Sequence, residues 1–355
     1  MKCPRIEFDL QKIRQNAEYI KEICSKSGVQ VMAVTKGYCG YPPVVKELYN
    51  AGIRNFGDSR IENIKRMREA GIKGEMTLIR IPMISEAEEV VQWADVSLNS
   101  EIKVLQALDN AAKKQEKIHK IILMVDVGDL REGVLPDDLE GFVSEALAFE
   151  NLKIIGLGFN VGCFGGVLPT EENTQLLIDL AQNIQDKFGI KLDILSGGST
   201  CALPLIEKNE LPQGINQFRI GEAIIIGRDS TGNRCVPGTR QDTVKLVAEV
   251  IELKRKPSMP IGKIGKDAFG NTPVFEDKGI RLRAILAVGR QDADPEKLIP
   301  LTDGIEILGG SSDHLLIDVT DSEDKFFVGK EVTFGLTYGA MLRLMTSEYV
   351  KKITI

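Results

Sequence analysis

The chain has 355 residues, and its 45 Lys and Arg against 51 Asp and Glu give a formal net charge of −6 at pH 7. At about 100–200 residues per domain, this length predicts two domains, or one large barrel with an appendage. Hydrophobic residues make up 43% and charged residues 27% of the chain, which excludes a disordered, collagen-like or mucin-like protein. The acidic balance and the lack of a dense basic block argue against nucleic acid as a partner.

The six cysteines do not form C-x-x-C pairs, and the chain has only two histidines. We therefore expect neither a metal site nor a disulfide framework, and a reducing compartment fits best. The amino terminus turns polar before an apolar segment of signal-peptide length accumulates, and no run of about 18 apolar residues occurs. These features predict a cytoplasmic protein without a membrane partner.

From the start of the chain to about residue 230, short β-branched runs alternate with segments of helical period, which is typical of βα units around a parallel sheet. The predicted helices cover residues 9–25, 60–70, 85–93, 101–117, 136–150 and 170–188. The predicted strands cover residues 29–36, 55–59, 77–81, 96–100, 121–128, 154–160, 193–200 and 217–226. Eight strands is the number in a closed (β/α)8 barrel, so we assign residues 1–232 to such a barrel.

The pattern changes after Gly232, where strand-like runs are joined by Gly, Pro and Asp turns with little helical period between them. These runs cover residues 244–256, 280–289, 305–312, 314–320 and 330–336. The Gly- and Pro-rich segment at 257–273 indicates a long loop. The fold class is therefore α/β: a (β/α)8 barrel followed by a β-rich domain at residues 233–355.

Active sites of (β/α)8 barrels lie at the carboxyl ends of the strands. Lys36 ends an apolar strand, where burial of its stem favours loss of the proton, as an imine-forming amine requires. A solvated lysine is the more common case at a strand end, so Lys36 needs independent support. The segments SGGST (196–200) and RIGEA (219–223) supply it, because small residues and backbone N–H groups after the last two strands of a barrel commonly bind phosphate.

Several motifs, in the same order along the chain, resemble those of the fold-type III pyridoxal-phosphate enzymes, the family of alanine racemase. VTKGYCG resembles VxKANAYG, VDVGDLREG resembles DTGMxRxG, and FRIGEAIIIG resembles xRPGIxLYG. In the second domain, GGSSDHLLIDVT, VGKEVTFG and TYGAML are similar to GRVSMDQxMVDVT, VGDEVxLxG and NYEIL. The resemblance implies pyridoxal 5′-phosphate at the mouth of the barrel, and a homodimer in which the β-domain completes the partner's site.

The resemblance also carries site positions onto this sequence. Lys36 would hold the cofactor and act as acid or base on one face, while Arg219 would face the pyridine nitrogen. Because an arginine only donates hydrogen bonds, that nitrogen would stay unprotonated, and a ring of this kind suits a racemase better than an aminotransferase. The further expected cofactor contacts are Asn160, Ser199, Thr200, Gly221, Glu222 and Tyr338. The further expected catalytic residues are Arg131, Arg290, Asp313, His314 and Cys201, with Ser312 in substrate binding.

Four positions depart from the family pattern. Arg290 stands where the family has its second catalytic tyrosine, and Asn160 replaces a histidine that lies against the ring. Gly40 replaces a phosphate-binding tyrosine, and Glu222 replaces an apolar residue. The pattern is more similar to the divergent subgroup that includes ornithine racemase. The proton donor for the second face is left open between Cys201, Cys163, His314, Asp313 and a water held by Arg290.

We therefore expect a racemase that removes and returns the Cα proton of a basic amino acid such as ornithine. The distal ammonium of that substrate needs an acidic partner, for which Glu222, Asp126, Asp129 and Asp292 are available. The alternatives are an alanine or serine racemase, a lyase resembling D-threonine aldolase or D-serine dehydratase, and a non-catalytic pyridoxal-phosphate carrier. The spacing of His314 and Asp318 does not match the metal pair of the lyases, and retention of the whole β-domain argues against the carrier.

Overall fold

The protein is described by a computed structural model that covers residues 2–355. Contacts divide the chain into two compact units, Leu10–Gln241 and a discontinuous one formed by the residues up to Asp9 together with Asp242–Ile355. This division differs from the predicted one at residues 232 and 233. Residues 233–241 stay with the first unit, where Val236 N donates to Gly227 O (2.9 Å) and Asn16 Nδ2 donates to Arg240 O (2.9 Å).

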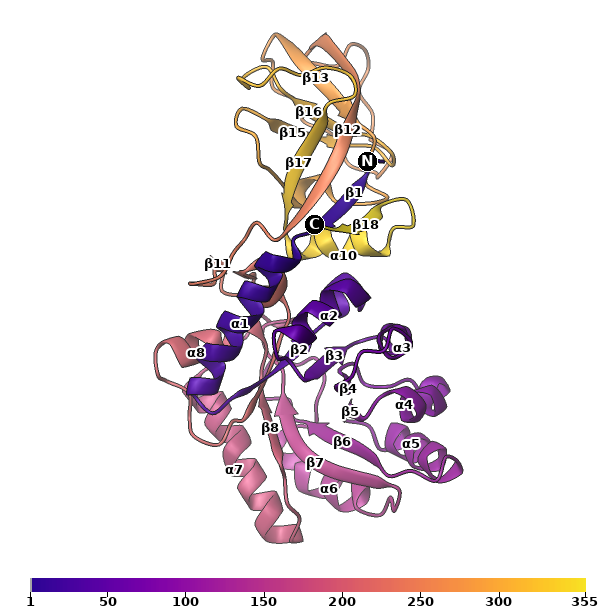
Figure 1. The fold of residues 1–355 in the computed structure, drawn as a ribbon, viewed down its shortest axis with the longest axis vertical. Coiled ribbons are helices and arrows are strands. Elements are labelled where there is room, and N and C mark those ends of the chain that lie inside the picture. Colours follow the sequence, from indigo (N-terminus) through magenta and orange to yellow (C-terminus); the bar gives the residue numbers. More distant parts are fainter. Residues whose placement is uncertain (1) are drawn as a thin grey trace. The chain divides into compact units, whose positions relative to one another are not determined.

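The first unit contains a closed barrel of eight strands, each parallel to its neighbours (Figure 1). The strands are β2 (Gln30–Val34), β3 (Asn55–Asp58), β4 (Glu75–Leu78), β5 (Val96–Asn99), β6 (His119–Met124), β7 (Leu152–Phe159), β8 (Ile194–Gly197) and β9 (Gln217–Ile220). The predicted (β/α)8 barrel is therefore confirmed. We call the end where these strands have their carboxyl termini the mouth.

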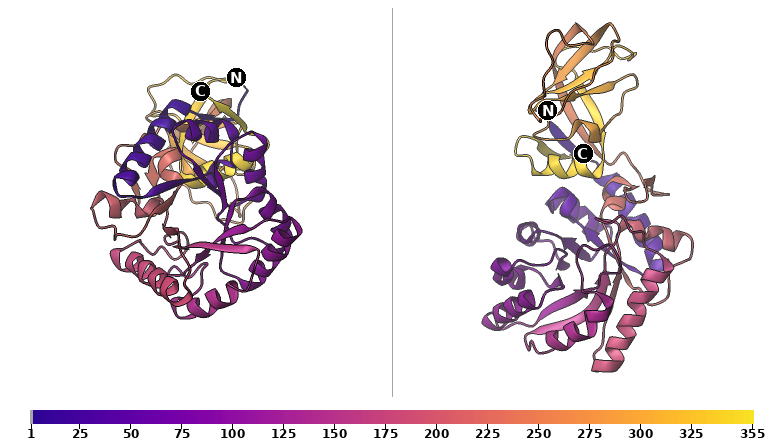
Figure 2. Two further views of the ribbon diagram at one scale, coloured as in Figure 1. Left: turned by 60° about the horizontal axis from the view of Figure 1, so that its bottom comes forward. Right: turned by 180° about the vertical axis from the view of Figure 1, so that it is seen from behind.

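Helices lie outside the ring of strands (Figure 2). The α-helices of this unit are α1 (Leu10–Lys26), α2 (Pro42–Asn50), α3 (Ile61–Glu69), α4 (Ala87–Trp93), α5 (Ile102–Lys114), α6 (Leu139–Ala146), α7 (Glu171–Phe188), α8 (Leu203–Glu207) and α9 (Glu222–Ile226). Single 3₁₀ turns are η1 (Lys36–Tyr38), η2 (Ile84–Glu86), η3 (Pro136–Asp138) and η4 (Thr200–Ala202), and β10 (Arg228–Asp229) pairs with β11 (Arg234–Cys235).

Helix α7 shows how local sequence sets the boundaries of these helices. Thr170 caps its first turn, where the side chain accepts a hydrogen bond from Asn173 N (3.3 Å). Gly189 ends the helix with φ of 64°, a conformation that costs glycine little because it has no Cβ. The buried residues Leu177, Ala181 and Ile184 recur at intervals of three and four, so one face of the helix is covered.

The eighth predicted strand, at residues 217–226, is shorter than expected. The strand ends at Ile220, and EAIII forms the short helix α9 instead. The physical reason lies at Gly221, whose carbonyl accepts hydrogen bonds from Ile224 N and Ile225 N (both 3.1 Å) and so starts a helical turn. The isoleucines are buried on all sides, and a run of buried apolar residues does not distinguish a strand from a helix.

The second unit is built on an eight-stranded sheet, as its predicted β-rich character requires. Its strands are β1 (Arg5–Phe8), β12 (Val244–Pro257), β13 (Ile280–Leu286), β14 (Leu298–Pro300), β15 (Glu306–Gly310), β16 (Leu315–Asp318), β17 (Glu331–Leu336) and β18 (Lys351–Thr354). It also contains η5 (Pro295–Lys297) and α10 (Tyr338–Thr346). Strand β1 belongs here because it pairs antiparallel with β12 and parallel with β18, which brings both ends of the chain into one sheet.

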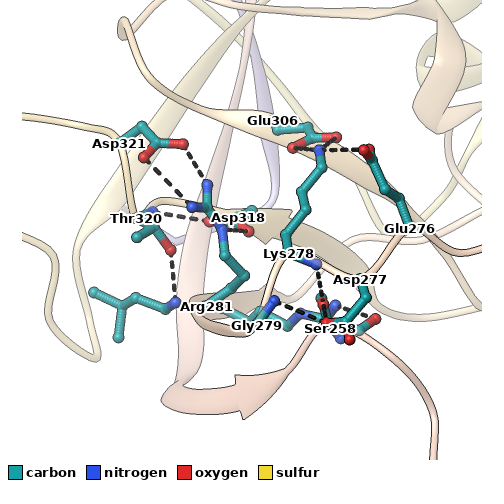
Figure 3. A network of polar contacts seen from close by, with 12 residues as sticks. Ser258, Glu276, Asp277, Lys278, Gly279, Arg281, Glu306, Asp318, Thr320 and Asp321 are labelled. Atoms are coloured by element: carbon teal, nitrogen blue, oxygen red, sulfur yellow. Dashed lines mark hydrogen bonds and ion pairs between the residues drawn. The ribbon is translucent and has the colours of Figure 1, made fainter.

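The predicted loop at 257–273 is confirmed and continues to β13. Its ends are fastened to each other: Ser258 N donates to Gly279 O (2.8 Å), and Ser258 Oγ donates to Asp277 Oδ1 (3.2 Å). Lys278 also forms an ion pair with Glu306 on β15 (2.9 Å; Figure 3). No helix of residues 2–355 combines the length and the apolar character needed to cross a membrane.

The buried imidazole of His119 should make the stability of the protein depend on pH. His119, at the start of β6, is 3% exposed, and its Nε2 lies 2.9 Å from Ser97 Oγ. Burial lowers its pKa to about 4. The unfolded chain titrates near 6.5, so it binds more protons than the folded chain between these values. This contribution to stability is therefore complete above pH 6.5 and is lost as the pH falls towards 4.

We expect the free energy of unfolding to drop by about 2 kcal/mol between pH 7 and pH 5 through this group alone. His119→Gln should remove that part of the pH dependence, as measured by urea unfolding at the two pH values. The control is His314→Gln, which removes an exposed imidazole in place of the buried one. Identical curves for wild type and His119→Gln would contradict this assignment.

Candidate active site

Lys36 and Arg219 come from neighbouring strands at the mouth. Lys36 lies two residues after the last residue of β2 and begins η1, and its side chain is half-buried. Strand β9 lies beside β2, in a register that pairs Met32 with Arg219. Since the last residues of parallel barrel strands meet at one end, this register brings both cations to the same sector of the mouth.

Arg219 is fully enclosed, and all its hydrogen-bond partners are uncharged. Nη2 donates to Phe159 O (2.7 Å) and to Asn160 Oδ1 (3.2 Å), while Nη1 donates to Ser196 Oγ (2.5 Å). Burial lowers the pKa of Arg219 to about 10, so the guanidinium remains charged at neutral pH. Asn160 Nδ2 is buried and has no partner among residues 2–355, because Arg219 fixes the amide by its oxygen.

The segments after β8 and β9 lie side by side, as the two glycine-containing motifs predict. Ser199 precedes η4 and Gly221 precedes α9, and Ala223 N donates to Thr200 Oγ1 (3.4 Å) across the gap. A Cβ at Gly221 would lie 3.1 Å from Val34 O on β2, so a side chain there would crowd the backbone of the strand that leads to Lys36. The starts of η4 and α9 therefore lie close together, with Gly221 beside the end of β2.

Each of the four carboxylates considered for a distal ammonium already has partners. Asp126 accepts from Gly128 N (2.8 Å) and Leu130 N (3.1 Å) and so shapes its own loop. Glu222 accepts from Ser230 N (3.0 Å) and Ser230 Oγ, and burial raises its pKa. Asp292, in the second unit, accepts from Ser347 Oγ (2.6 Å).

Asp129 fastens two loops of the mouth together. Only 2% exposed, its carboxylate accepts from Gly162 N (3.2 Å), Phe164 N (3.1 Å) and Val167 N (3.3 Å). The loop after β6 therefore holds the loop after β7 by three backbone hydrogen bonds. Asp129 therefore has a structural role at the mouth.

Arg131 lies in the same loop after β6 and pairs with Glu132. Both Nε and Nη2 of Arg131 donate to the Glu132 carboxylate, the second over 2.5 Å. The loop is closely folded: a Cβ at Gly133 would lie 2.4 Å from Asp126 N, and Val134 N donates to Met124 O (2.8 Å). Glu132 was not among the predicted residues, and its only signal in the sequence is that it follows Arg131.

Cys201 is a neutral thiol in this setting. It is buried, donates to Val161 O (3.7 Å) and lies 3.3 Å from Ser199 Oγ. Burial raises its pKa to about 11, so it is protonated at neutral pH and is poorly suited to removing a proton. Cys163 is exposed in the loop after β7 and interacts with Arg131.

The remaining predicted residues lie in the second unit, and all except Tyr338 lie on two loops that touch. Arg290 N donates to Ser311 O (2.8 Å), and a Cβ at Gly289 would lie 2.2 Å from Ser312 O. The Arg290 guanidinium donates to Gly310 O (3.0 Å), pairs with Glu296 and stacks on the Phe269 ring at 5.3 Å. The structure thus brings Arg290 together with the turn that carries Ser312, Asp313 and His314.

Asp313 and His314 are exposed, and His314 Nδ1 lies 3.3 Å from Ser311 Oγ. Tyr338 is half-buried and begins α10. That helix is tied to the same loops because Arg343 Nη2 donates to Arg290 O (2.8 Å).

A second set of contacts lies beside Lys36. Asp58, at the end of β3, accepts from Thr35 Oγ1 (2.5 Å), Arg60 N (3.0 Å) and Asn63 Nδ2 (2.9 Å). Burial raises the pKa of Asp58, while these donors and the nearby Lys36 charge act against the rise. This network holds the turn from which Lys36 projects. Within residues 2–355, no group of three or more His, Cys, Asp and Glu side chains could hold a metal ion.

A lysine after the first barrel strand, a buried guanidinium on the last, and small residues beside both are the arrangement expected of an enzyme of the (β/α)8 barrel class. Residues 8–229 match the family model described as "Alanine racemase, N-terminal domain". The chain is 46% identical to an ornithine racemase of Acetoanaerobium sticklandii, over 98% of this chain and 99% of that protein. It is 44% identical to a lysine racemase of Thermotoga maritima, over 99% of each chain.

Among solved structures, an alanine racemase of Clostridium difficile 630 has the same fold, with a TM-score of 0.78 at 16% identity. That likeness covers 100% of this chain and 96% of the other. An alanine racemase of Bartonella henselae, solved with covalently bound pyridoxal phosphate, gives a TM-score of 0.75 at 16% identity and covers 100% of both chains. The chain belongs to the alanine racemase family and is an amino-acid racemase.

Proposed function

We propose that the protein is a pyridoxal-phosphate-dependent racemase of a basic amino acid, with ornithine as the first substrate to test. The observation that carries this proposal is that Lys36, after the end of β2, and the enclosed Arg219, on β9, come from neighbouring strands of the barrel. The names of the two relatives at 46% and 44% identity, an ornithine racemase and a lysine racemase, support the substrate class.

The residues of the mouth fit a phosphorylated pyridine cofactor. Arg219 is an enclosed cation whose hydrogen-bond partners are all neutral, so an additional acceptor in the ring suits its charge. Ser199, Thr200 and Gly221 are small residues around one corner, which suits a phosphate. Lys36 would hold the cofactor through its amine. The buried Asn160 Nδ2 remains available as a further donor.

When bound, pyridoxal phosphate acidifies the Cα proton of an attached amino acid by delocalising charge into its ring. The chain's own residues must then position the substrate and move protons. Lys36 Nζ takes or returns the proton on one face of Cα. Arg219 would face the pyridine nitrogen. Because an arginine only donates hydrogen bonds, that nitrogen would stay unprotonated, and the ring would withdraw less charge from Cα. This favours return of the proton to Cα over side reactions.

We also propose that the protein works as a homodimer in which Arg290, Ser312, Asp313 and Tyr338 complete the partner's site. The support is that three of these residues lie on two touching loops of the second unit, and that α10 is tied to the same loops. The donor for the second face would come from this group or from Cys163. A monomer that retains full activity at high dilution would contradict this arrangement.

The test begins with the absorption spectrum of the purified protein, followed by borohydride reduction and mapping of the labelled peptide. We expect the reduced cofactor on Lys36. Chiral chromatography should then detect interconversion of ornithine or lysine with a higher kcat/KM than for alanine or serine. Failure to bind added pyridoxal phosphate would overturn the proposal, whereas binding on Lys36 without steady turnover of any amino acid would favour the carrier alternative.

A further inference from the structure

The mouth contains one carboxylate whose role is not explained by the cofactor or by loop folding. Asp126 and Asp129 are used to fold loops, whereas Glu132 bonds to the side chain of Arg131. Its own side chain is 23% exposed and that of Arg131 is 34% exposed, so both reach the surface of the mouth. Glu132 therefore touches a predicted catalytic residue directly and borders open space.

The planar shape of the guanidinium means that Glu132 can fix the orientation of Arg131. Glu132 occupies the edge of Arg131 formed by Nε and Nη2, while Nη1 is not part of the pair. A guanidinium bound along one edge is fixed in its plane and can still present its Nη1 and Nη2 end to a second carboxylate. Without Glu132, the long Arg131 side chain would gain rotational freedom that ligand binding would have to remove.

The backbone supports the same arrangement. Leu130 and Gly133 both have positive φ, 53° and 134°, so the loop has a specific fold on either side of Arg131 and Glu132. Asp126 closes the loop from one end and Asp129 anchors it to the loop after β7. The pair therefore stands on a fixed base. Only the two side chains themselves remain to be oriented.

Glu132 also acts on the second arginine of the mouth. Arg219 is enclosed by neutral partners, and Glu132 has the largest influence of the charged groups that act on it. Arg131 acts on Arg219 with the opposite sign. The negative charge of Glu132 therefore offsets part of the repulsion that Arg131 exerts on Arg219.

We propose that Glu132 is a positioning residue that orients Arg131 to bind the α-carboxylate of the amino-acid substrate. The inference rests on the proposed function and names the part of the site that recognises the substrate's carboxylate. It makes Glu132 a determinant of substrate binding and leaves proton transfer to other residues.

The probe is 5-aminopentanoate, which keeps the carboxylate and distal ammonium of ornithine but lacks the α-amino group needed for reaction. Its affinity for the cofactor-loaded protein is measured by titration calorimetry, and KM and kcat for ornithine are measured in parallel. We expect Glu132→Gln to weaken 5-aminopentanoate binding and raise KM about tenfold or more, as loss of a charge-assisted contact does, with kcat within about threefold. The matched control is Glu140→Gln, which removes an exposed carboxylate paired with Lys187 and should change neither value.

A double-mutant cycle tests whether Glu132 acts through Arg131. Lysine cannot form the two-pronged pair, so Arg131→Lys should weaken 5-aminopentanoate binding by itself, and Glu132→Gln should add little in that background. Unchanged affinity in Glu132→Gln, or fully additive effects in the double variant, would overturn the proposal. If Glu132→Gln does not fold, Glu132→Asp keeps the charge at a shorter reach and should weaken binding by a smaller factor, and an unchanged affinity there would also overturn it.

This outcome can be separated from failure of the proposed function. Wild-type protein that neither racemises ornithine nor carries reduced cofactor on Lys36 would contradict the proposed function. Wild-type protein that does both, alongside a Glu132→Gln variant with normal KM and normal 5-aminopentanoate affinity, would contradict only the role of Glu132.

Discussion

Lys36→Ala should lower the rate of ornithine racemisation by about 10³-fold or more, because a single residue supplies both the covalent attachment and the proton transfer on one face. Borohydride treatment should no longer link the cofactor to the chain. Chiral chromatography measures the first effect and peptide mapping the second. The barrel should remain folded, since the half-buried Lys36 follows β2 rather than forming part of it.

The control for Lys36 is Lys120, which lies on β6 and forms an ion pair with Glu75 (3.3 Å). Lys120→Ala removes a lysine from the same unit. Because Lys120 lies near the amino end of β6, away from the mouth, the racemisation rate should stay unchanged. A Lys36→Ala variant that keeps more than a tenth of the wild-type rate would show that another amine carries the reaction.

Arg219→Glu should have the second large effect. Racemisation should fall about 100-fold, because the guanidinium is replaced by a carboxylate, which accepts a hydrogen bond from a protonated ring nitrogen and so stabilises the protonated ring. The fraction of substrate converted to its keto acid should rise, because a protonated ring withdraws more charge from Cα. Keto-acid formation, measured beside racemisation in one reaction, separates these two effects. An unchanged ratio of keto acid to racemised product would contradict the role given to Arg219.

Arg219→Gln distinguishes loss of the arginine from gain of the carboxyl group. It should lower racemisation without raising the fraction of keto acid, since a neutral amide does not stabilise a protonated ring nitrogen to the same degree. Both variants leave Phe159 O without its buried donor, at a cost of about 1–3 kcal/mol in the free energy of unfolding. Arg54→Gln is the control: that guanidinium stacks on Tyr49 at 4.0 Å and precedes β3, so racemisation should be unaffected.

Most strands and helices of the barrel could be predicted from the hydrophobic periodicity of the sequence. The alternation of β-branched runs with amphipathic segments is a local property, so strands such as β6 and helices such as α7 could be predicted within a few residues. Helix α2 was not among the predicted helices. It begins with two prolines, and proline is compatible with the first turn of a helix but not with its interior. In α9, isoleucines buried on every side removed the periodic signal.

The second unit shows a different limit. Strand β1 is only four residues long and precedes a helix, so its sequence resembles the start of the barrel. Its partners β12 and β18 lie more than 200 residues further along the chain, and pairing at such a distance leaves no trace in the local pattern. The boundary between the units therefore could not be found from composition alone.

For the site, the sequence by itself determined which residues end the barrel strands, and with them Lys36, Arg219 and the segments around Thr200 and Gly221. Motif order and strand position depend on neighbours along the chain, so one sequence is enough to read them. The tertiary structure alone decided which charges are engaged. Asp129 is occupied by backbone amides 33–38 residues away, and Arg219 is surrounded by neutral groups from β7 and β8. Hydrogen-bond satisfaction and burial depend on distance in space, which a residue's neighbours in the sequence do not fix.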